Sequence, residues 1–146
     1  MKIVLASKSG VRKEILDKYS IKSIVSPSNV DEDQVKEALL EKGADPEMIS
    51  KNLAELKSVK VSAKFSDQLV LGADSVISLD SKLINKPNSR NEAYNILKLL
   101  NGKKHYLISS VCISKNGAMI WNHTDKSELK MKNLSDGELK IYLEGI

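Results

Sequence analysis

The sequence predicts one domain of the mixed α/β class with at least one antiparallel hairpin. Short apolar runs bounded by turn residues alternate with stretches whose apolar residues recur at helical spacing. Two long extended segments, 104–114 and 118–131, are joined at Asn116-Gly117, which is the commonest two-residue hairpin turn. No repeat, low-complexity stretch or linker divides the chain, so we expect a single domain over 1–146.

The chain begins with the pattern of a strand, a turn and a helix. An apolar run over 2–6 ends in the small polar residues of 7–10, after which apolar residues recur at helical spacing. A second strand is expected over 22–26, and Pro27 ends it.

Two helices are expected next. Acidic residues at 31–33 open the first of them, and Gly43 closes it. Asp45 and Pro46 then form a strong helix start, with aspartate as the N-cap and proline at the first helical position. We expect this second helix to extend to about Lys64.

The remaining elements complete the α/β pattern. A buried strand over 69–79 is expected to form a hairpin with 83–84. The segments 89–92 and 135–138 both have the form of a capping box and predict two further helices, the first of which ends at 101–102.

Composition excludes several classes of protein. With 41% apolar and 29% charged residues the chain has ordinary globular composition, and no uncharged stretch is long enough for a membrane span or a signal peptide. We therefore expect a cytoplasmic protein. The single cysteine, Cys112, lies in an apolar run and is expected to be buried without a redox role. The net charge of +4 arises from interspersed residues, and the aromatic content of 4% leaves few rings for base stacking.

The turn after the first strand is a candidate anion site. It carries Ser7 and Ser9, and Arg12 and Lys13 follow in the first turn of the helix. Free backbone N–H groups and the helix dipole favour an anion there, and the two cations reinforce this. The alternative is that Ser9 only caps the helix and the two cations are solvated. From this turn alone the two interpretations are about equal.

A second candidate site lies at Asp74, which follows a strongly apolar strand. A carboxylate there is costly unless it has a metal or hydrogen-bonding partner, although it could also cap a turn. Glu32, Lys57 and Lys86 are unremarkable when each is taken alone. The two histidines have no third ligand at zinc-binding spacing, so any metal should be bound by oxygen.

Six motifs in order carry a resemblance to the Maf family of nucleoside triphosphate pyrophosphatases. They are Leu5-Ala6-Ser7-Lys8-Ser9-Gly10-Val11-Arg12-Lys13-Glu14-Ile15-Leu16, Val30-Asp31-Glu32, Leu53-Ala54-x-x-Lys57, Gly72-Ala73-Asp74-Ser75-Val76, Lys86-Pro87 and Leu100-Asn101-Gly102-Lys103-Lys104-His105. The resemblance covers essentially the whole chain. It implies a mixed central sheet with flanking helices and a cleft, as in Maf and ITPase-like proteins.

The resemblance also implies a reaction and a site. The expected reaction converts a nucleoside triphosphate, which can be a modified or non-standard one, to the monophosphate and pyrophosphate. By position, Asp74 matches the proton acceptor, and the other catalytic positions are Glu32, Lys57 and Lys86. The substrate-binding positions are Ser7, Ser9, Val11, Arg12, Lys13 and Ser75. Glu32 and Asp74 are the expected ligands of Mg²⁺, or of Mn²⁺ in its place.

This sequence departs from the family pattern at both positions that are linked to base choice. They are Val11, where the preceding proline is also replaced, and Ser75, so the sequence does not name the base. Family members also continue past the position of Ile146 with a Gly-rich segment that carries a pocket Gln or Glu, and the domain is expected to be incomplete without it.

Three further expectations concern partners. The resemblance is compatible with a homodimer, and neither a membrane nor a stable nucleic-acid partner is expected. A rival hypothesis is a catalytically weak nucleotide-binding regulator of cell division. A second rival, which rests on the sequence pI of 9.0, is a nucleic-acid-binding module, but the basic residues are not concentrated as such proteins require.

Overall fold

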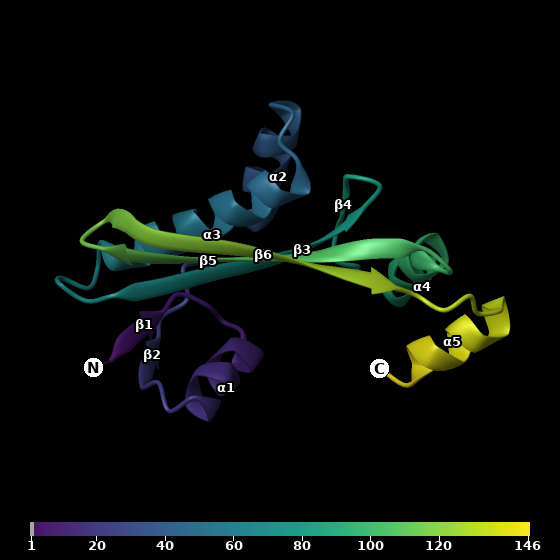
Figure 1. Ribbon diagram of the computed structural model, residues 1–146, viewed down its shortest axis with the longest axis horizontal. Coiled ribbons are helices and arrows are strands. Elements are labelled where there is room, and N and C mark those ends of the chain that lie inside the picture. The colour runs from purple at the N-terminus through teal and green to yellow at the C-terminus, as the bar shows by residue number, and fades with distance from the viewer. Residues whose placement is uncertain (1) are drawn as a thin grey trace.

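The computed structural model describes residues 2–146 and contains a six-stranded mixed sheet with helices around it (Figure 1). The elements in chain order are β1 (Ile3–Leu5), α1 (Gly10–Lys18), β2 (Ser23–Val25), α2 (Glu32–Glu41), α3 (Pro46–Ser62), β3 (Val70–Leu79), β4 (Lys82–Ile84), α4 (Arg90–Leu100), β5 (Lys104–Lys115), β6 (Ala118–Lys130) and α5 (Asp136–Glu144). The predicted mixed α/β class is confirmed, and every predicted helix and strand is present.

The strand order is β2-β1-β3-β5-β6, and β4 pairs with β3 beside this path. β1 runs parallel to both β2 and β3, whereas the other pairs are antiparallel. At the β5–β6 turn, φ is 51° at Asn116 and 83° at Gly117. Positive φ at both positions is what a type I′ hairpin turn requires, so the predicted hairpin is confirmed.

One edge of β3 is shared by two short strands that do not meet. β1 pairs with β3 as far as Leu71, and β4 begins to pair at Ile77, while the other edge of β3 pairs with β5 from Val70 to Ser78. In the described chain, residues 72–76 therefore have a strand neighbour on only one side. Asp74 lies in the middle of this gap.

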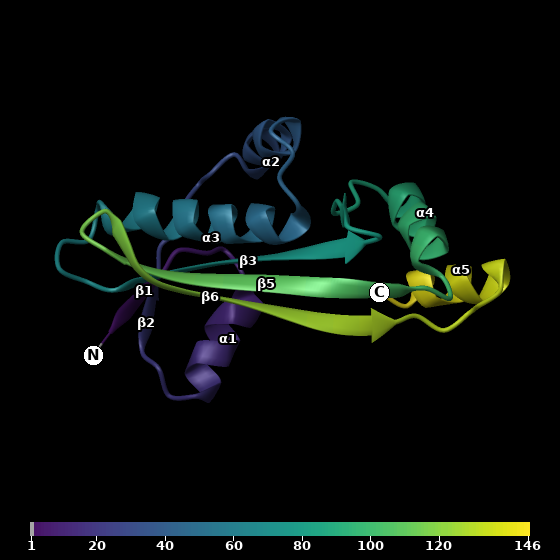
Figure 2. The same ribbon diagram turned by 45° about the horizontal axis from the view of Figure 1, so that its top comes forward.

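Helix α3 packs along one face of the sheet, over β3 and β5 (Figures 1 and 2). Its buried face carries small residues at four-residue spacing, which are Ser50, Ala54, Ser58 and Ser62. On β3 the matching position is Gly72, where an added Cβ would lie 2.4 Å from the Ala54 carbonyl oxygen. The helix and the strand approach this closely because neither has a large side chain at the contact.

Buried hydroxyl groups fix the position of this helix on the sheet. Ser50 Oγ donates to the backbone carbonyl of Asp74 at 3.0 Å, and Ser58 Oγ lies 2.7 Å from Ser114 Oγ. Ser62 Oγ accepts a hydrogen bond from the backbone N–H of Gly117. Because hydrogen bonds require specific distances and angles, these bonds fix the position of α3 along the sheet.

Two apolar clusters support the helix on the sheet. One joins the amino-terminal strand to the end of α3 and consists of Val4, Ala6, Val61 and Val70. The other lies beneath the start of α3 and consists of Ile49, Leu53, Val76 and Ile108. Cys112 is fully buried in the same layer, as predicted.

The predicted helix starts are mostly confirmed. Asp45 caps α3 by accepting from the Met48 N–H, and Ser135 and Glu138 form a complete capping box on α5. The box expected at 89–92 is only half formed. Ser89 accepts from the Glu92 N–H, but the Glu92 carboxylate accepts from the N–H of Asn88 instead of that of Ser89.

The last two helices, α4 and α5, contact each other at one end of the sheet (Figure 2). Arg90 Nη1 donates to the Leu143 carbonyl at 3.1 Å and so joins the start of α4 to the end of α5. No helix within 2–146 combines the length and the apolar character that crossing a membrane would require.

Candidate active site

The carboxyl ends of the parallel strands β1 and β2 lie level with the first part of β3, before Asp74. β1 lies between β2 and β3, and its last paired residue, Leu5, pairs with Leu71. Because parallel strands end at the same edge of a sheet, the segments that follow β1 and β2 reach the side of β3 that carries Asp74. The turn at 7–10 and the segment 28–33 form the walls of a cleft there.

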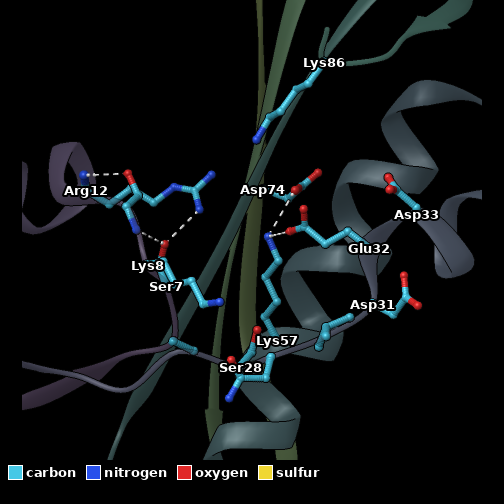
Figure 3. Close-up of a pocket in the computed structure, with 14 residues that line it drawn as sticks. Ser7, Lys8, Arg12, Ser28, Asp31, Glu32, Asp33, Lys57, Asp74 and Lys86 are labelled. Atoms are coloured by element: carbon cyan, nitrogen blue, oxygen red, sulfur yellow. Dashed lines mark hydrogen bonds and ion pairs between the residues drawn. The ribbon is translucent and has the colours of Figure 1, made fainter. Parts of the chain in front are cut away.

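The cleft is a cavity of about 560 Å³ (Figure 3). Residues from α1, α2, α3, β3 and the connections after β1, β2 and β4 line it, and they are Ala6, Ser7, Lys8, Ser9, Arg12, Ser28, Asn29, Val30, Asp31, Glu32, Asp33, Lys57, Asp74 and Lys86. Lys8, Arg12 and Lys86 lie apart from the acidic residues of 31–33, with Lys57 and Asp74 between them (Figure 3). The cavity thus has a cationic side and an acidic side.

The cationic side is built on the start of α1. Ser9 caps the helix by accepting from the Arg12 N–H at 3.2 Å. Ser7 Oγ accepts two hydrogen bonds, one from Arg12 Nη1 at 3.2 Å and one from the Ser9 N–H at 3.1 Å. A hydroxyl has two acceptor positions and one proton, so the proton of this buried serine remains available to an acceptor in the cavity.

Lys57 holds the floor of the cavity together. Its Nζ donates to Asp74 Oδ1 at 3.2 Å, to the Ala73 carbonyl at 3.3 Å, and also pairs with Glu32 Oε1. The lysine side chain is only 8% exposed, and that of Asp74 is 7% exposed. The ammonium thus has three acceptors for its three protons and lies between two carboxylates.

A buried oxygen of this cluster has no hydrogen-bond partner in the part of the chain that the structure describes. Within residues 2–146, Asp74 Oδ2 is a buried polar atom without a hydrogen bond. An unpartnered buried carboxylate oxygen is costly, and at such a position a ligand or a function is the usual explanation. Asp74 is therefore held through Oδ1 and available through Oδ2.

The two carboxylates differ in acidity. Burial raises the pKa of Asp74 above its ordinary value of 3.8, and Lys57 and Lys36 offset this only in part. Burial acts in the same direction on Glu32, but there the hydrogen bond and charge of Lys57, with the charges of Lys36 and Lys86, outweigh it. The pKa of Glu32 is held below its ordinary value of 4.5. Asp74 is the better proton acceptor of the two.

We predict that Glu32→Gln destabilises the protein at pH 7 by about 1 kcal/mol or less, since the pair is partly exposed. The pKa of Glu32 is lowered by folding, so its contribution is fully present above pH 4.5 and is lost as the pH falls through the lowered value. Urea denaturation of both proteins over a range of pH measures this. The difference in unfolding free energy should narrow below pH 4.5, and a difference that widens there would contradict the assignment.

The structure brings most of the predicted site residues together. Ser7, Ser9, Arg12, Glu32, Lys57, Asp74 and Lys86 all line the cavity. Lys8, Ser28 and the acidic neighbours of Glu32 also line the cavity, although they were not predicted as site residues. Lys8 lies between the two serines of the candidate anion turn, and that position is the signal that could have identified it.

Three predicted substrate-binding residues lie outside the cavity. Val11 is 65% exposed, and Lys13 Nζ pairs with Asp17 at 2.7 Å along α1. Successive helical residues point about 100° apart, so neither shares the direction of Arg12. Ser75 Oγ lies 2.9 Å from Ser109 Oγ on the sheet face opposite Asp74, because side chains alternate along a strand.

The carboxylates of the cavity are possible ligands for a divalent cation. Within 2–146 no three His, Cys, Asp or Glu side chains form a metal-binding group, so the chain offers at most the two carboxylates Glu32 and Asp74. Two carboxylates with the rest of the shell from water and phosphate is the usual arrangement for Mg²⁺. The unpartnered Oδ2 of Asp74 is a suitable ligand atom, so these residues fit such an ion.

The sequence matches a known family over almost its whole length. The model described as Maf-like protein matches residues 2–145. A nucleoside triphosphate pyrophosphatase of Pelagibacter ubique is 62% identical over 144 residues, which are 99% of this chain and 74% of the relative. A 7-methyl-GTP pyrophosphatase of Brucella abortus is 34% identical over 143 residues, which are 98% of this chain and 72% of the relative.

Solved structures with low sequence identity share the fold. A HAM1 protein from Coxiella burnetii has a TM-score of 0.51 and 14% identity, over 89% of this chain and 72% of the other. A nucleoside-triphosphatase described as a dITP/XTP pyrophosphatase, from Mycobacterium abscessus, has a TM-score of 0.51 and 13% identity, over the same shares. These similarities extend to architecture alone.

Proposed function

This chain belongs to the family of Maf-like proteins, and we propose that it is a nucleoside triphosphate pyrophosphatase that uses the cavity at Asp74. The substrate would be a nucleoside triphosphate, and the products would be the monophosphate and pyrophosphate. The observation that carries the proposal is a buried aspartate with one free oxygen, fixed by Lys57 in a cavity whose other side is cationic.

The cationic side suits a triphosphate. Within 2–146 the ion pairs among the cavity residues all involve Lys57, which leaves Lys8, Arg12 and Lys86 for an anionic ligand. The start of α1 adds backbone N–H groups and the positive end of a helix dipole, and Ser7 adds a hydroxyl proton. Phosphoryl transfer depends on neutralising the phosphate oxygens, and these groups can do so.

Asp74 is the proposed proton acceptor. As water attacks the α-phosphorus and the bond from that atom to the oxygen bridging the α- and β-phosphates breaks, a proton of that water passes to the Asp74 carboxylate. Pyrophosphate carries the bonding electrons away. Without a bound ligand, Lys57 holds the carboxylate through Oδ1, and the raised pKa makes Asp74 a stronger base than an exposed aspartate.

Glu32 and Asp74 are the residues that would hold Mg²⁺. The ion would neutralise phosphate charge and favour ionisation of the attacking water. Besides this ion, the chain itself supplies Lys57 and Lys86 as cations that line the same cavity.

Pyrophosphate release from a panel of standard and modified nucleoside triphosphates, with Mg²⁺ and with EDTA, tests the proposal. We expect equal amounts of monophosphate and pyrophosphate with Mg²⁺ and no release with EDTA. The panel also identifies the base. Release of orthophosphate with a nucleoside diphosphate, or release that EDTA does not affect, would contradict the proposed reaction.

We predict that Arg12→Ala raises KM for the triphosphate by about tenfold or more, which is the usual effect of losing a charged hydrogen bond. Lys13→Ala is the matched control, because Lys13 is the next residue of α1 but pairs with Asp17 outside the cavity. Steady-state kinetics should show little change in KM for the control. An equal rise in KM in both variants would mean that the overall positive charge of α1, and not the position of Arg12 in the cavity, attracts the substrate.

A further inference from the structure

The Lys57 ammonium occupies the place where a cation bound by both Glu32 and Asp74 would lie. It touches one oxygen of each carboxylate at the floor of the cavity, where Lys57 and Asp74 are buried and Glu32 is half-buried (Figure 3). We propose that Lys57 competes with the divalent ion for these carboxylates, so that the ion enters only as the ammonium moves away. This inference rests on the proposed function and adds an order of events to it.

Charge balance supports the competition. The cluster carries two negative charges and one positive charge, so with the ammonium in place its net charge is −1. A divalent ion added beside the ammonium would bring two cations into contact in a site that is only partly exposed, where water screens their repulsion less than at the surface. When the ion replaces the ammonium, the two carboxylates are neutralised.

The displaced ammonium then needs another anion. Lys57 lines the cavity, and the cationic side of the same cavity is where the triphosphate would bind. If the ion displaced the ammonium without nucleotide present, the ammonium would exchange its three protein acceptors for water at best. Such a loss is costly for a buried charge. With nucleotide, phosphate oxygens replace those acceptors. The divalent ion should therefore bind weakly alone and more tightly together with substrate.

Binding of Mn²⁺ alone, followed by electron paramagnetic resonance, tests the competition without turnover. We expect Lys57→Met to bind Mn²⁺ at least about tenfold more tightly than the wild type, because a cation in direct contact is removed. Lys51→Met is the control, since it removes the same charge from an exposed position of α3. In the Asp74→Asn background the gain from Lys57→Met should disappear. Unchanged or weaker binding by Lys57→Met would overturn the inference.

A second measurement on the wild type separates displacement from simple charge removal. Reductive methylation quantified by mass spectrometry reports how accessible each lysine is. Saturating Mg²⁺ should raise labelling at Lys57 and leave Lys51 unchanged. Lys57 that stays protected with Mg²⁺ bound would show that both cations coexist, and it would overturn the proposal even if Lys57→Met does not fold.

The two proposals fail separately. Metal-dependent pyrophosphate release, together with Mn²⁺ affinity that Lys57→Met does not raise, would overturn the competition alone. Tighter Mn²⁺ binding and Mg²⁺-induced labelling at Lys57, without any pyrophosphate release, would overturn the proposed function alone.

Discussion

Asp74→Asn is expected to abolish pyrophosphate release, with kcat lower by about a thousandfold or more, and to leave the fold intact. Loss of a general base costs ~10² to 10⁴ in rate. An amide cannot accept the proton of the attacking water, and it is a weaker ligand for a divalent ion. Asparagine keeps the shape of the side chain and an oxygen that can still accept from Lys57. Single-turnover measurement of pyrophosphate release is the assay.

Stability provides the control for this variant. The pKa of Asp74 is raised by folding, so the folded protein binds this proton more tightly than the unfolded chain does. Ionisation of Asp74 therefore lowers stability at pH values above the raised pKa, and this cost disappears below pH 3.8. Asp74→Asn should be at least as stable as the wild type at pH 7, with the advantage shrinking on acidification. An unfolded or weakly stable variant would make the lost activity uninformative.

Gly72→Ala is expected to destabilise the protein by at least about 3 kcal/mol, the upper range for overpacked cores. The new Cβ would lie 2.4 Å from the Ala54 carbonyl oxygen and 2.7 Å from the Ser58 amide nitrogen. Both are backbone atoms, so the clash is relieved only if α3 moves away from β3. Because Lys57 is on α3, we expect activity to fall as well.

Gly10→Ala is the matched comparison for the glycine substitution. Its new Cβ would have nothing within 4 Å, and Gly10 is the first residue of α1. A glycine replaced by alanine at a compatible position changes stability by only ~0.4 to 1 kcal/mol, usually upward. Urea denaturation of both variants measures the contrast. If Gly72→Ala proved as stable as Gly10→Ala, the close approach of helix and strand would be refuted.

Local signals were sufficient to predict the elements. The Asp45-Pro46 start, the Asn116-Gly117 turn and the box at 135–138 are each decided by neighbouring residues, and the structure contains all three. The order of the strands in the sheet, in contrast, could not be predicted from local signals. Nothing in the sequence of β1 states that it lies between β2 and β3, because that choice depends on packing across the whole sheet.

The geometry of the site could be predicted from the sequence only in part, and the reason is physical. The contact of Lys57 with Asp74 depends on how closely α3 approaches β3, which tertiary packing sets. The small side chains of α3 that permit this close approach recur at four-residue spacing, and that spacing can be read in the sequence. Val11, Lys13 and Ser75 were proposed by position in motifs. Helical and strand periodicity points them away from Arg12 and Asp74, and their role in substrate binding stays a prediction.

The short junction of β1 with β3 has a consequence for motion. β1 leads into the turn that carries Ser7 and into α1, which carries Arg12, yet among the described residues its pairing with β3 has two positions, at Val70 and Leu71. Detaching the segment 3–25 would need less free energy than unfolding the α3–β3–β5 layer, so its amides should exchange hydrogen sooner. A nucleotide that contacts both Arg12 and Asp74 would link the segment 3–25 to the rest of the sheet. Substrate binding should therefore also stabilise this amino-terminal segment against local unfolding.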